Sequence, residues 1–410
     1  MSTAETAFGR RAAVVLAVLL LPALGGAAAL AADSAPAAGV SVRESGPTYR
    51  TGWREGHKDH KWEERSIGLD TGRALYTLKY SACVDPSHPG VRALEEGYIG
   101  MPTPTAANWY HSGFFFIRVN GKEVGEFPLA DMRVTERGAR AACHMVWDTP
   151  DARVRVQFLV KGGSERLLSQ VTCVPVTGHT VESVEFKFTC YPSFFTAHHH
   201  RQGDRTLITP RTEAHEPSTT ALDPVADTYL LFEDTVFDVA KGEGDGPCAM
   251  LFLPEPIAAG TVQLSNYPVQ TTLKAAPGAL RFRFVFWDFQ KRTNAEAAAF
   301  LKENGAAARD ELRQTEFRPE LLVAFDAAGA QAELQGLLAA AAEDGQRLKA
   351  AGEGLMRKLT ELRQRADADD WSAEAEFAAA YADYEAFLWK LRIYALLNSA
   401  PAAAAPAVRD

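Results

Sequence analysis

The hydrophobic periodicity of this 410-residue chain changes once, between Phe289 and Thr293. Before this point apolar residues occupy every second position, as at Phe282, Phe284 and Phe286, which places them on one face of a β-strand. Beyond it they recur every third or fourth position, which is typical of one face of a helix. The sequence therefore predicts a mainly β fold, in which a large antiparallel β-sandwich body is followed by a C-terminal α-helical hairpin.

We expect the β-sandwich domain to span residues 73–290, behind a linker or edge segment at residues 32–72. The clearest hairpin signal is Asn120-Gly121, because both residues accept the positive φ of a type I′ turn. In the strand predicted at 153–160, Val154 and its alternate neighbours share one face, while Arg155 and Gln157 point to the other. Strands with one apolar and one polar face indicate antiparallel sheets packed on one side.

The helical tail is predicted at residues 293–398, and the Ala-Pro-rich residues 399–410 are expected to be disordered. Thr293 and Glu296 form a capping box for a first helix. After a break at Pro319, apolar residues follow at seven-residue spacing, namely Leu334, Ala341, Leu348, Leu355 and Leu362. This pattern predicts one long helix, and a second helix up to residue 398 completes the hairpin.

Two glycines, Gly345 and Gly352, interrupt the apolar seam of the long helix. They indicate either a weak seam or a close approach of the neighbouring chain. The hairpin as a whole has two interpretations, since its apolar stripe can pack against its own β body or against another copy of the chain. Homo-oligomerisation through the tail therefore stays open.

Residues 1–31 have the features of a signal peptide. Arg10 and Arg11 precede the apolar run 12–24, which is too short to span a bilayer, and Ala29 to Ala31 provide a cleavage site. We expect an exported protein, periplasmic or extracellular, with no stable membrane anchor.

The net charge argues against one class of partner, and the cysteine content allows two arrangements of the thiols. The formal net charge is -9, so the basic footprint of a nucleic-acid-binding protein is absent. An oxidising compartment would permit two disulfides and one remaining thiol, whereas buried, inert thiols are the alternative. The five cysteines are Cys83, Cys143, Cys173, Cys190 and Cys248.

The densest polar segment follows the strand predicted at residues 181–190. Its candidate catalytic residues are His198, His199, His200, Asp204, Arg205 and Arg211. Imidazole transfers protons near neutral pH, and a carboxylate with guanidinium groups suits a sugar or carboxylate ligand. Adjacent residues of a strand face opposite ways, so no metal site is predicted for the three histidines.

Aromatic residues in two loops are candidates for ligand binding, because a flat ring can stack on a sugar. They are Trp109, Tyr110, His111, Phe194 and Phe195. The alternative for each is a place in the core, for example as a plug at one end of the sandwich.

A further acidic cluster, Glu233, Asp234 and Asp238, could perform acid–base chemistry if its carboxylates converge, but Asp234 also suits a tight turn. No phosphate loop, dinucleotide fingerprint or nucleophile elbow occurs, so the sequence names no cofactor.

The long β-rich body with its Asn-Gly hairpin and aromatic loops resembles the galactose-mutarotase-like supersandwich proteins, over about residues 73–289. This resemblance implies a protein that handles sugars. Three hypotheses follow: non-catalytic glycan binding, a carbohydrate-active epimerase or lyase that uses the His/Asp/Arg segment, and an assembly protein that acts through its helices.

Overall fold

The computed structural model describes residues 39–51, 61–85, 98–103, 108–109, 113–192, 203–240, 246–289 and 291–399. The predicted signal peptide, the three consecutive histidines and the tail beyond residue 399 lie outside these ranges. Within them, no helix is both long enough and apolar enough to cross a membrane.

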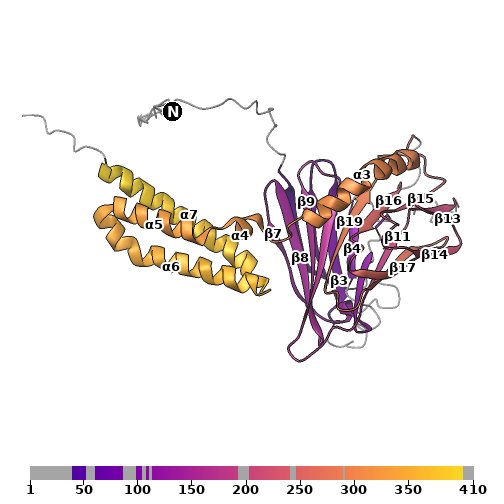
Figure 1. Cartoon of the computed structure of the whole chain (residues 1–410), viewed down its shortest axis with the longest axis horizontal. Helices are drawn as coiled ribbons and strands as arrows, with labels where there is room; N and C mark the ends of the chain where they lie inside the picture. Colours follow the sequence, from indigo (N-terminus) through magenta and orange to yellow (C-terminus); the bar gives the residue numbers. More distant parts are fainter. Residues whose placement is uncertain are drawn as a thin grey trace, which may run out of the picture. The chain divides into compact units, whose positions relative to one another are not determined.

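Two antiparallel sheets form the body, which confirms the predicted fold class (Figure 1). The first sheet has the order β1-β2-β3-β4-β5-β11-β18-β17-β14, with β6 beside β5. Its strands are β1 (Ser41–Thr51), β2 (Lys61–Asp70), β3 (Leu75–Cys83), β4 (Tyr98–Thr103), β5 (Phe115–Val119), β6 (Lys122–Glu123), β11 (Val184–Cys190), β14 (Ser218–Leu222), β17 (Ile257–Leu264) and β18 (Val269–Ala275). A single 3₁₀ turn, η1 (Val124–Glu126), follows β6.

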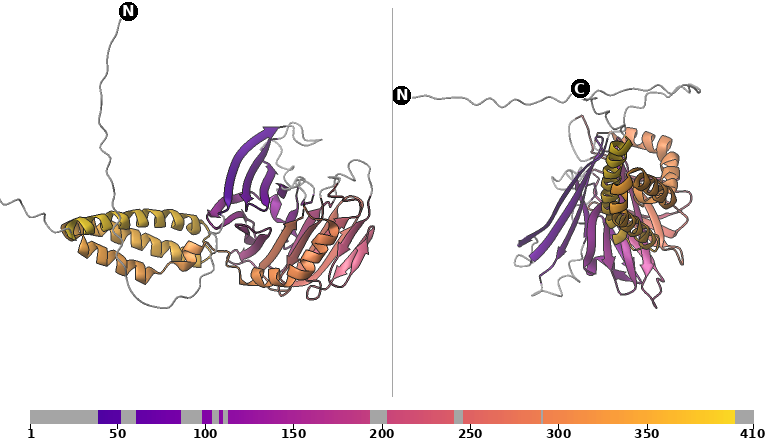
Figure 2. Two further views of the ribbon diagram at one scale, coloured as in Figure 1. Left: turned by 90° about the horizontal axis from the view of Figure 1, so that it is seen from above. Right: turned by 90° about the vertical axis from the view of Figure 1, so that its left-hand side faces the viewer.

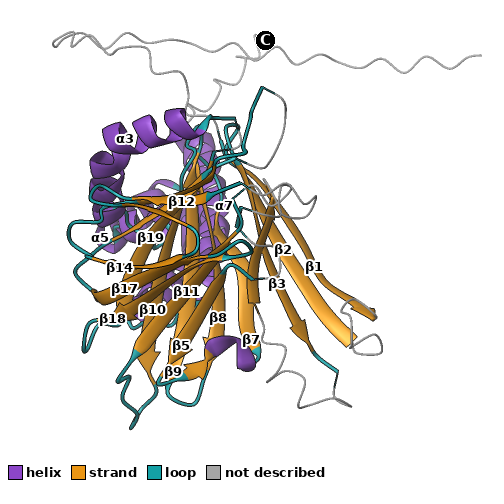
Figure 3. Cartoon of the chain, turned by 90° about the vertical axis from the view of Figure 1, so that its right-hand side faces the viewer, coloured by secondary structure: helices purple, strands orange, loops and turns teal. Residues whose placement is uncertain are grey.

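The second sheet has the order β13-β12-β15-β16-β19-β10-β9-β8-β7. Its strands are β7 (Leu129–Glu136), β8 (Arg140–Asp148), β9 (Ala152–Lys161), β10 (Leu167–Pro175), β12 (Arg205–Ile208), β13 (Glu213–His215), β15 (Leu230–Asp234), β16 (Cys248–Phe252) and β19 (Arg281–Asp288). Figure 3 shows the strands of both sheets. Because β1 and β2 belong to the first sheet, its strands begin about thirty residues before the expected boundary at 73.

The sequence patterns with a direct stereochemical cause appear as predicted. Asn120 (φ 52°) and Gly121 (φ 79°) close the β5–β6 hairpin in the left-handed region. The capping box at Thr293 and Glu296 starts α3 (Asn294–Gln314).

All five cysteines are buried and carry free thiols, so the buried-thiol alternative describes them.

The second sheet is buried on both faces, which corrects the expectation of sheets packed on one side. Its inner face shares the main core with the first sheet, through residues such as Phe284 and Phe286. Its outer face packs Val285 and Trp287 against Leu301 and other apolar residues of α3. The signal was present in the sequence, since β19 is apolar at consecutive positions and not only at alternate ones.

The tail forms a bundle of three long helices, in place of the predicted hairpin (Figure 2). They are α5 (Ala327–Ala340), α6 (Ala342–Asp367) and α7 (Ser372–Ser399), preceded by the short α4 (Glu320–Ala324). The predicted long helix reverses direction at Ala342, which takes a φ of 52°. The seven-residue apolar pattern continues through this break because both helices face one core.

Close packing explains both glycines of the seam. A Cβ added to Gly345 would lie 1.9 Å from the carbonyl oxygen of Leu338, so α6 can turn against the end of α5 only with glycine there. A Cβ at Gly352 would lie 2.8 Å from Phe387. The close approach, and not a weak seam, is therefore the reason for these residues.

Gly345→Ala should destabilise the bundle, because the added methyl group overlaps a backbone atom that cannot move independently. We expect a loss of about 1–3 kcal/mol in the free energy of unfolding, measured by denaturant titration followed by circular dichroism. Gly354→Ala is the matched control: it lies in the same helix with nothing within 4 Å of an added Cβ. It should gain about 0.5–1 kcal/mol. Equal effects of the two substitutions would contradict this packing.

Candidate ligand-binding cleft

Turns from both sheets meet at one end of the sandwich. The β2–β3 turn belongs to the first sheet and the β9–β10 turn to the second. Gly163 donates its backbone N–H to the carbonyl of Thr71 at 2.8 Å, and the Thr71 hydroxyl donates to the carbonyl of Ser164 at 2.7 Å. Tyr76, at the start of β3, donates its phenol to the carbonyl of Glu165 at 2.6 Å. These bonds fix the two turns beside each other.

The end of β19 and the start of α3 complete this region. Asp288 Oδ1 accepts from Asn108 Nδ2 at 3.2 Å, and Glu165 Oε2 accepts from Arg292 Nη2 at 2.6 Å. The Arg292 guanidinium also lies 4.2 Å from the ring centroid of Phe300, which sets the direction of its side chain. Three segments that are distant in the sequence thus converge on one place.

Between them lies a cleft of about 380 Å³. This volume falls within the range of about 300–1,000 Å³ that is usual for small-molecule sites. Its charged lining residues are Asp70, Arg73, Glu165, Asp288, Lys291 and Arg292. Ala74 and the partly exposed Leu75 add a small apolar surface.

The electrostatics of the cleft are mixed, with three carboxylates and three cations. Burial and the nearby carboxylate of Asp288 raise the pKa of Tyr76 well above its ordinary value, so its phenol remains a hydrogen-bond donor. The lining therefore offers donors and acceptors side by side, which is what a ligand with many hydroxyl groups requires. Among the described residues no group of three or more metal-ligating side chains occurs.

Trp109 does not line this cleft, which corrects its assignment as a ligand platform. Its side chain is buried, and its indole N–H donates to the carbonyl of Trp287 at 3.0 Å. Its ring meets Phe114 and Phe286 edge to face, at centroid distances of 5.8 and 5.1 Å. Trp109 is thus a core residue, as the alternative interpretation had it. Tyr110, His111, Phe194 and Phe195 lie outside the described residues.

The predicted catalytic residues that the structure describes have separate partners. Asp204 Oδ2 lies 2.7 Å from His215 Nδ1 on the exposed β12–β13 edge. Arg211 forms a two-pronged ion pair with Asp227, at 3.0 and 2.6 Å. Arg205 is buried and donates to backbone carbonyls, those of Pro192, Ser265 and Tyr267. His198, His199 and His200 lie outside the described residues.

The members of the acidic cluster in and after β15 also have separate surroundings. Asp234 is buried and accepts from the backbone N–H of Val236 at 2.9 Å, which is the tight-turn role expected for it. Burial, with the nearby Glu213, raises the pKa of Glu233 to about 6. Because Glu233 and Asp234 are neighbours on a strand, their side chains face opposite ways.

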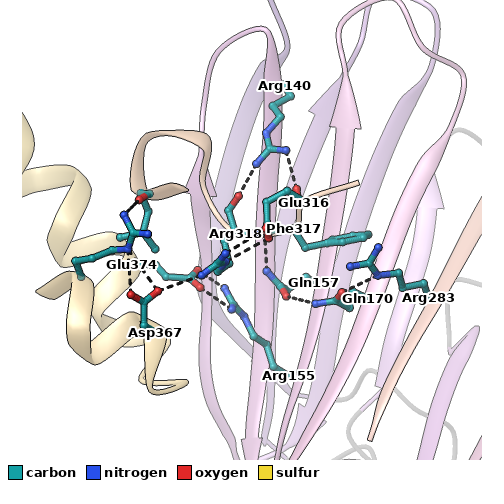
Figure 4. A network of polar contacts seen from close by, with 12 residues as sticks. Arg140, Arg155, Gln157, Gln170, Arg283, Glu316, Phe317, Arg318, Asp367 and Glu374 are labelled. Atoms are coloured by element: carbon teal, nitrogen blue, oxygen red, sulfur yellow. Dashed lines mark hydrogen bonds and ion pairs between the residues drawn. The ribbon is translucent and has the colours of Figure 1, made fainter. Parts of the chain in front are cut away.

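A second concentration of polar side chains lies where the tail meets the outer face of the second sheet (Figure 4). Arg155 on β9 donates from both terminal nitrogens to Glu374 on α7, with Nη1 2.8 Å from Oε1. Its Nε donates to His144 Nδ1 at 3.1 Å. Arg155, Glu374 and His144 are all almost completely buried.

Glutamine side chains extend this network toward α3. Gln157 donates to the carbonyl of Phe317 at 3.0 Å and accepts from Gln170 at 3.2 Å. Gln170 in turn accepts from Arg283 at 2.9 Å. Because these groups satisfy one another, we assign the network a structural role in holding the tail on the sheet.

The hydrogen bonds also fix the tautomer of His144. The Arg155 Nε is always a donor, so the His144 Nδ1 must accept, and its Nε2 carries the proton that is shared with Asp131 at 2.8 Å. Burial lowers the pKa of His144 and the charge of Arg155 adds to this, and together they outweigh the hydrogen bond with Asp131, which raises it. Burial raises the pKa of Asp131, but hydrogen bonds from His144 and Arg133 outweigh this and leave it below its ordinary value.

Sequence reasoning missed the cleft residues because they come from separate turns whose meeting depends on the strand order.

No known family model and no curated protein matches the chain. Solved structures with similarity include the galactosidase domain of the alpha-galactosidase-sucrose kinase AgaSK, with 11% identity and a TM-score of 0.32. A variant of the GH36 alpha-galactosidase AgaA from Geobacillus stearothermophilus in complex with stachyose has 9% identity and a TM-score of 0.29.

Each of these two matches covers 54% of this chain and 40% of the other. A third, 4-alpha-glucanotransferase from Thermococcus litoralis, has 10% identity and a TM-score of 0.27, over 55% of this chain and 37% of the other. The chain thus spans less than half the length of these proteins. Because the similarities are low, they assign no function to this chain.

Glu374→Ala should destabilise the protein strongly, since it leaves the buried Arg155 without its carboxylate. We expect a loss of about 3–5 kcal/mol in the free energy of unfolding, measured by denaturant titration. Replacing both partners, as Arg155→Met with Glu374→Leu, should restore most of the lost free energy of unfolding. Asp344→Ala, which breaks the more exposed pair with Arg347, is the control and should change little. A small effect of Glu374→Ala would contradict the proposed role.

The lowered pKa of His144 predicts a pH dependence of stability. The unfolded chain takes up the proton first as the pH falls, since an ordinary histidine has a pKa of 6.5. The contribution of His144 is therefore complete above this pH and is lost as the pH falls toward the pKa of the folded state. As the pH falls, the free energy of unfolding of His144→Gln should therefore decrease less steeply than that of the wild type. His179→Gln, at an exposed site, should follow the wild type.

Proposed function

We propose that this chain is an exported protein whose β-sandwich body binds a glycan, or a related polyhydroxylated ligand, without catalysis. The observation that carries the proposal is the cleft of about 380 Å³ lined by three carboxylates and three cations. Sugar hydroxyl groups donate and accept at once, so neighbouring carboxylates and cations can bind vicinal hydroxyls together. Leu75 can support the apolar face of a sugar ring.

The position of the cleft favours binding by a preformed site. Its walls are turns held by hydrogen bonds, such as those of Thr71 and Tyr76, and by the ion pair between Glu165 and Arg292. A rigid site loses little conformational entropy when a ligand binds. The catalytic alternative uses one of the histidines 198–200 with Asp204, Arg205 or Arg211, and within the described residues these three side chains have separate partners.

Export is the second part of the proposal and rests on the sequence of residues 1–31. It is tested by expressing the full chain with its N-terminus intact and determining the N-terminal sequence of the protein outside the cytoplasm. Cleavage after Ala31 supports it. Retention of the uncleaved chain in the cytoplasm contradicts it.

Ligand binding is tested by a glycan-array screen of the mature chain, with and without EDTA, followed by calorimetry on the glycans that bind. Arg73→Ala and Asp70→Asn should each weaken binding at least about tenfold, because one charge-assisted hydrogen bond contributes about 1.5–3 kcal/mol. Lys349→Ala and Asp310→Asn, which lie on α6 and α3 away from the cleft lining, are the charge-matched controls.

Two results would contradict the proposal. Unchanged affinity in both cleft variants would place the ligand elsewhere. Conversion of the bound glycan to a new product, detected by mass spectrometry, would make the chain an enzyme.

A further inference from the structure

Helix α7 carries two apolar stripes on different faces. The first is buried in the three-helix bundle and includes Phe377, Tyr384, Leu388 and Leu391. The second faces outward and consists, from its N-terminal end, of Ala375, Ala379, Ala382, Ala386, Trp389, Ile393 and Leu396. Its large members are well exposed, with 62% for Trp389, 56% for Ile393 and 69% for Leu396. We call these seven residues the outer seam.

The spacing of the outer seam is that of a helix-pairing surface. Successive members are separated alternately by four and three residues, without interruption over three heptads. This is the a/d pattern by which one helix packs its side chains into the gaps of another. A stripe that only covered its own bundle would be buried, and this one is not. An exposed apolar surface of this kind marks an interaction site.

Side-chain size divides the outer seam into two halves. The N-terminal half contains only alanines, and the C-terminal half contains Trp389, Ile393 and Leu396. Two parallel copies would set tryptophan against tryptophan and alanine against alanine, which crowds one end and leaves gaps at the other. Antiparallel copies set each large residue against a small one, which fills the layers evenly.

One antiparallel register aligns the six seam residues from Ala379 to Leu396, and only Ala375 has no partner within the seam. A two-fold axis between Phe387 and Leu388 sets Trp389 against Ala386 of the second copy. The same axis sets Ile393 against Ala382 and Leu396 against Ala379 of the second copy. Each layer then contains one large and one small side chain.

The charges beside the outer seam fit the same register. Asp383 then lies across from Lys390 of the second copy, and Glu385 lies across from Arg392 of the second copy. By symmetry each of these pairs of opposite charge forms twice. A parallel arrangement would pair only Glu385 with Lys390, so the charges favour antiparallel pairing.

We propose that α7 pairs with α7 of a second copy of this chain through the outer seam, as an antiparallel, two-fold symmetric homodimer. Because the two-fold axis makes the interface self-complementary, the assembly closes at two copies and does not extend into a filament. The proposal is independent of the glycan cleft, which lies on the β-sandwich body.

The test is sedimentation velocity of the full mature chain over a series of concentrations. The wild type should form a dimer whose fraction rises with concentration and does not exceed two copies. Ile393→Asp places a charge in the seam, opposite Ala382 of the second copy, and should raise the dissociation constant at least about tenfold. Val225→Asp, at a residue that is 71% exposed on the body, is the control and should leave the dimer unchanged.

A swap of residue sizes tests the register. Ala382→Ile alone should weaken the dimer, because it sets isoleucine against Ile393 of the second copy. Adding Ile393→Ala restores one large and one small residue in that layer only if the helices are antiparallel, so the double variant should dimerise like the wild type. Far-ultraviolet circular dichroism checks that each variant is folded.

Three outcomes would overturn the proposal. They are a wild-type chain that is monomeric at every concentration, a dimer that Ile393→Asp leaves intact, and a double variant that stays as weak as Ala382→Ile.

Discussion

The buried ion pair between Arg155 and Glu374 is the contact on which the arrangement of this chain depends. It joins β9, the third strand from the β7 edge of the second sheet, to the first turn of α7, 219 residues later in the sequence. Taking both charges out of water is costly, and their attraction repays this only because the geometry is two-pronged and the Nε donor of Arg155 has a partner in His144. Such a pair contributes less to stability than to specificity, since a helix without a carboxylate at this place would leave the charge of Arg155 buried without a partner.

The outer face of the second sheet consequently has two regions with different chemistry. Under α3 it is apolar, with Trp287 and Val285 packed against Leu301 and Leu312. Toward α7 it is polar, with Gln157 and other residues that bond to one another and to backbone carbonyls of the chain segment between the helices. The apolar region supplies burial and the polar region selects one orientation, because a shifted tail would leave buried donors without acceptors.

Local stereochemistry was predictable from the sequence, whereas contacts between segments that are distant in the sequence were not. The Asn120-Gly121 turn, the capping box at Thr293 and the change of period each depend on a few adjacent residues, and all three are present. The reversal at Ala342 was missed because alanine rarely adopts a positive φ and the heptad pattern ran through the turn. Gly345 was the available clue, since its close contact with Leu338 permits the reversal.

The candidate cleft was missed for a related reason. Its carboxylates come from the end of β2, the β9–β10 turn and the end of β19, and only the strand order brings these segments together. The residues singled out from the sequence were chosen because polar side chains are close together in that segment. Such clusters are common in loops and need not form a site. Arg205, beside a loop, donates to three backbone carbonyls instead.

Hydrogen exchange of the full chain tests most directly whether the tail is fixed on the sheet by its polar contacts. The first turn of α7 and the central part of β9 should open in one step, so that their slowest amides show the same free energy of opening and lose protection together in Glu374→Ala. If the amides of α7 exchange with a much lower free energy than those of β9, and Glu374→Ala leaves β9 unchanged, the ion pair does not join the two parts and the account is contradicted.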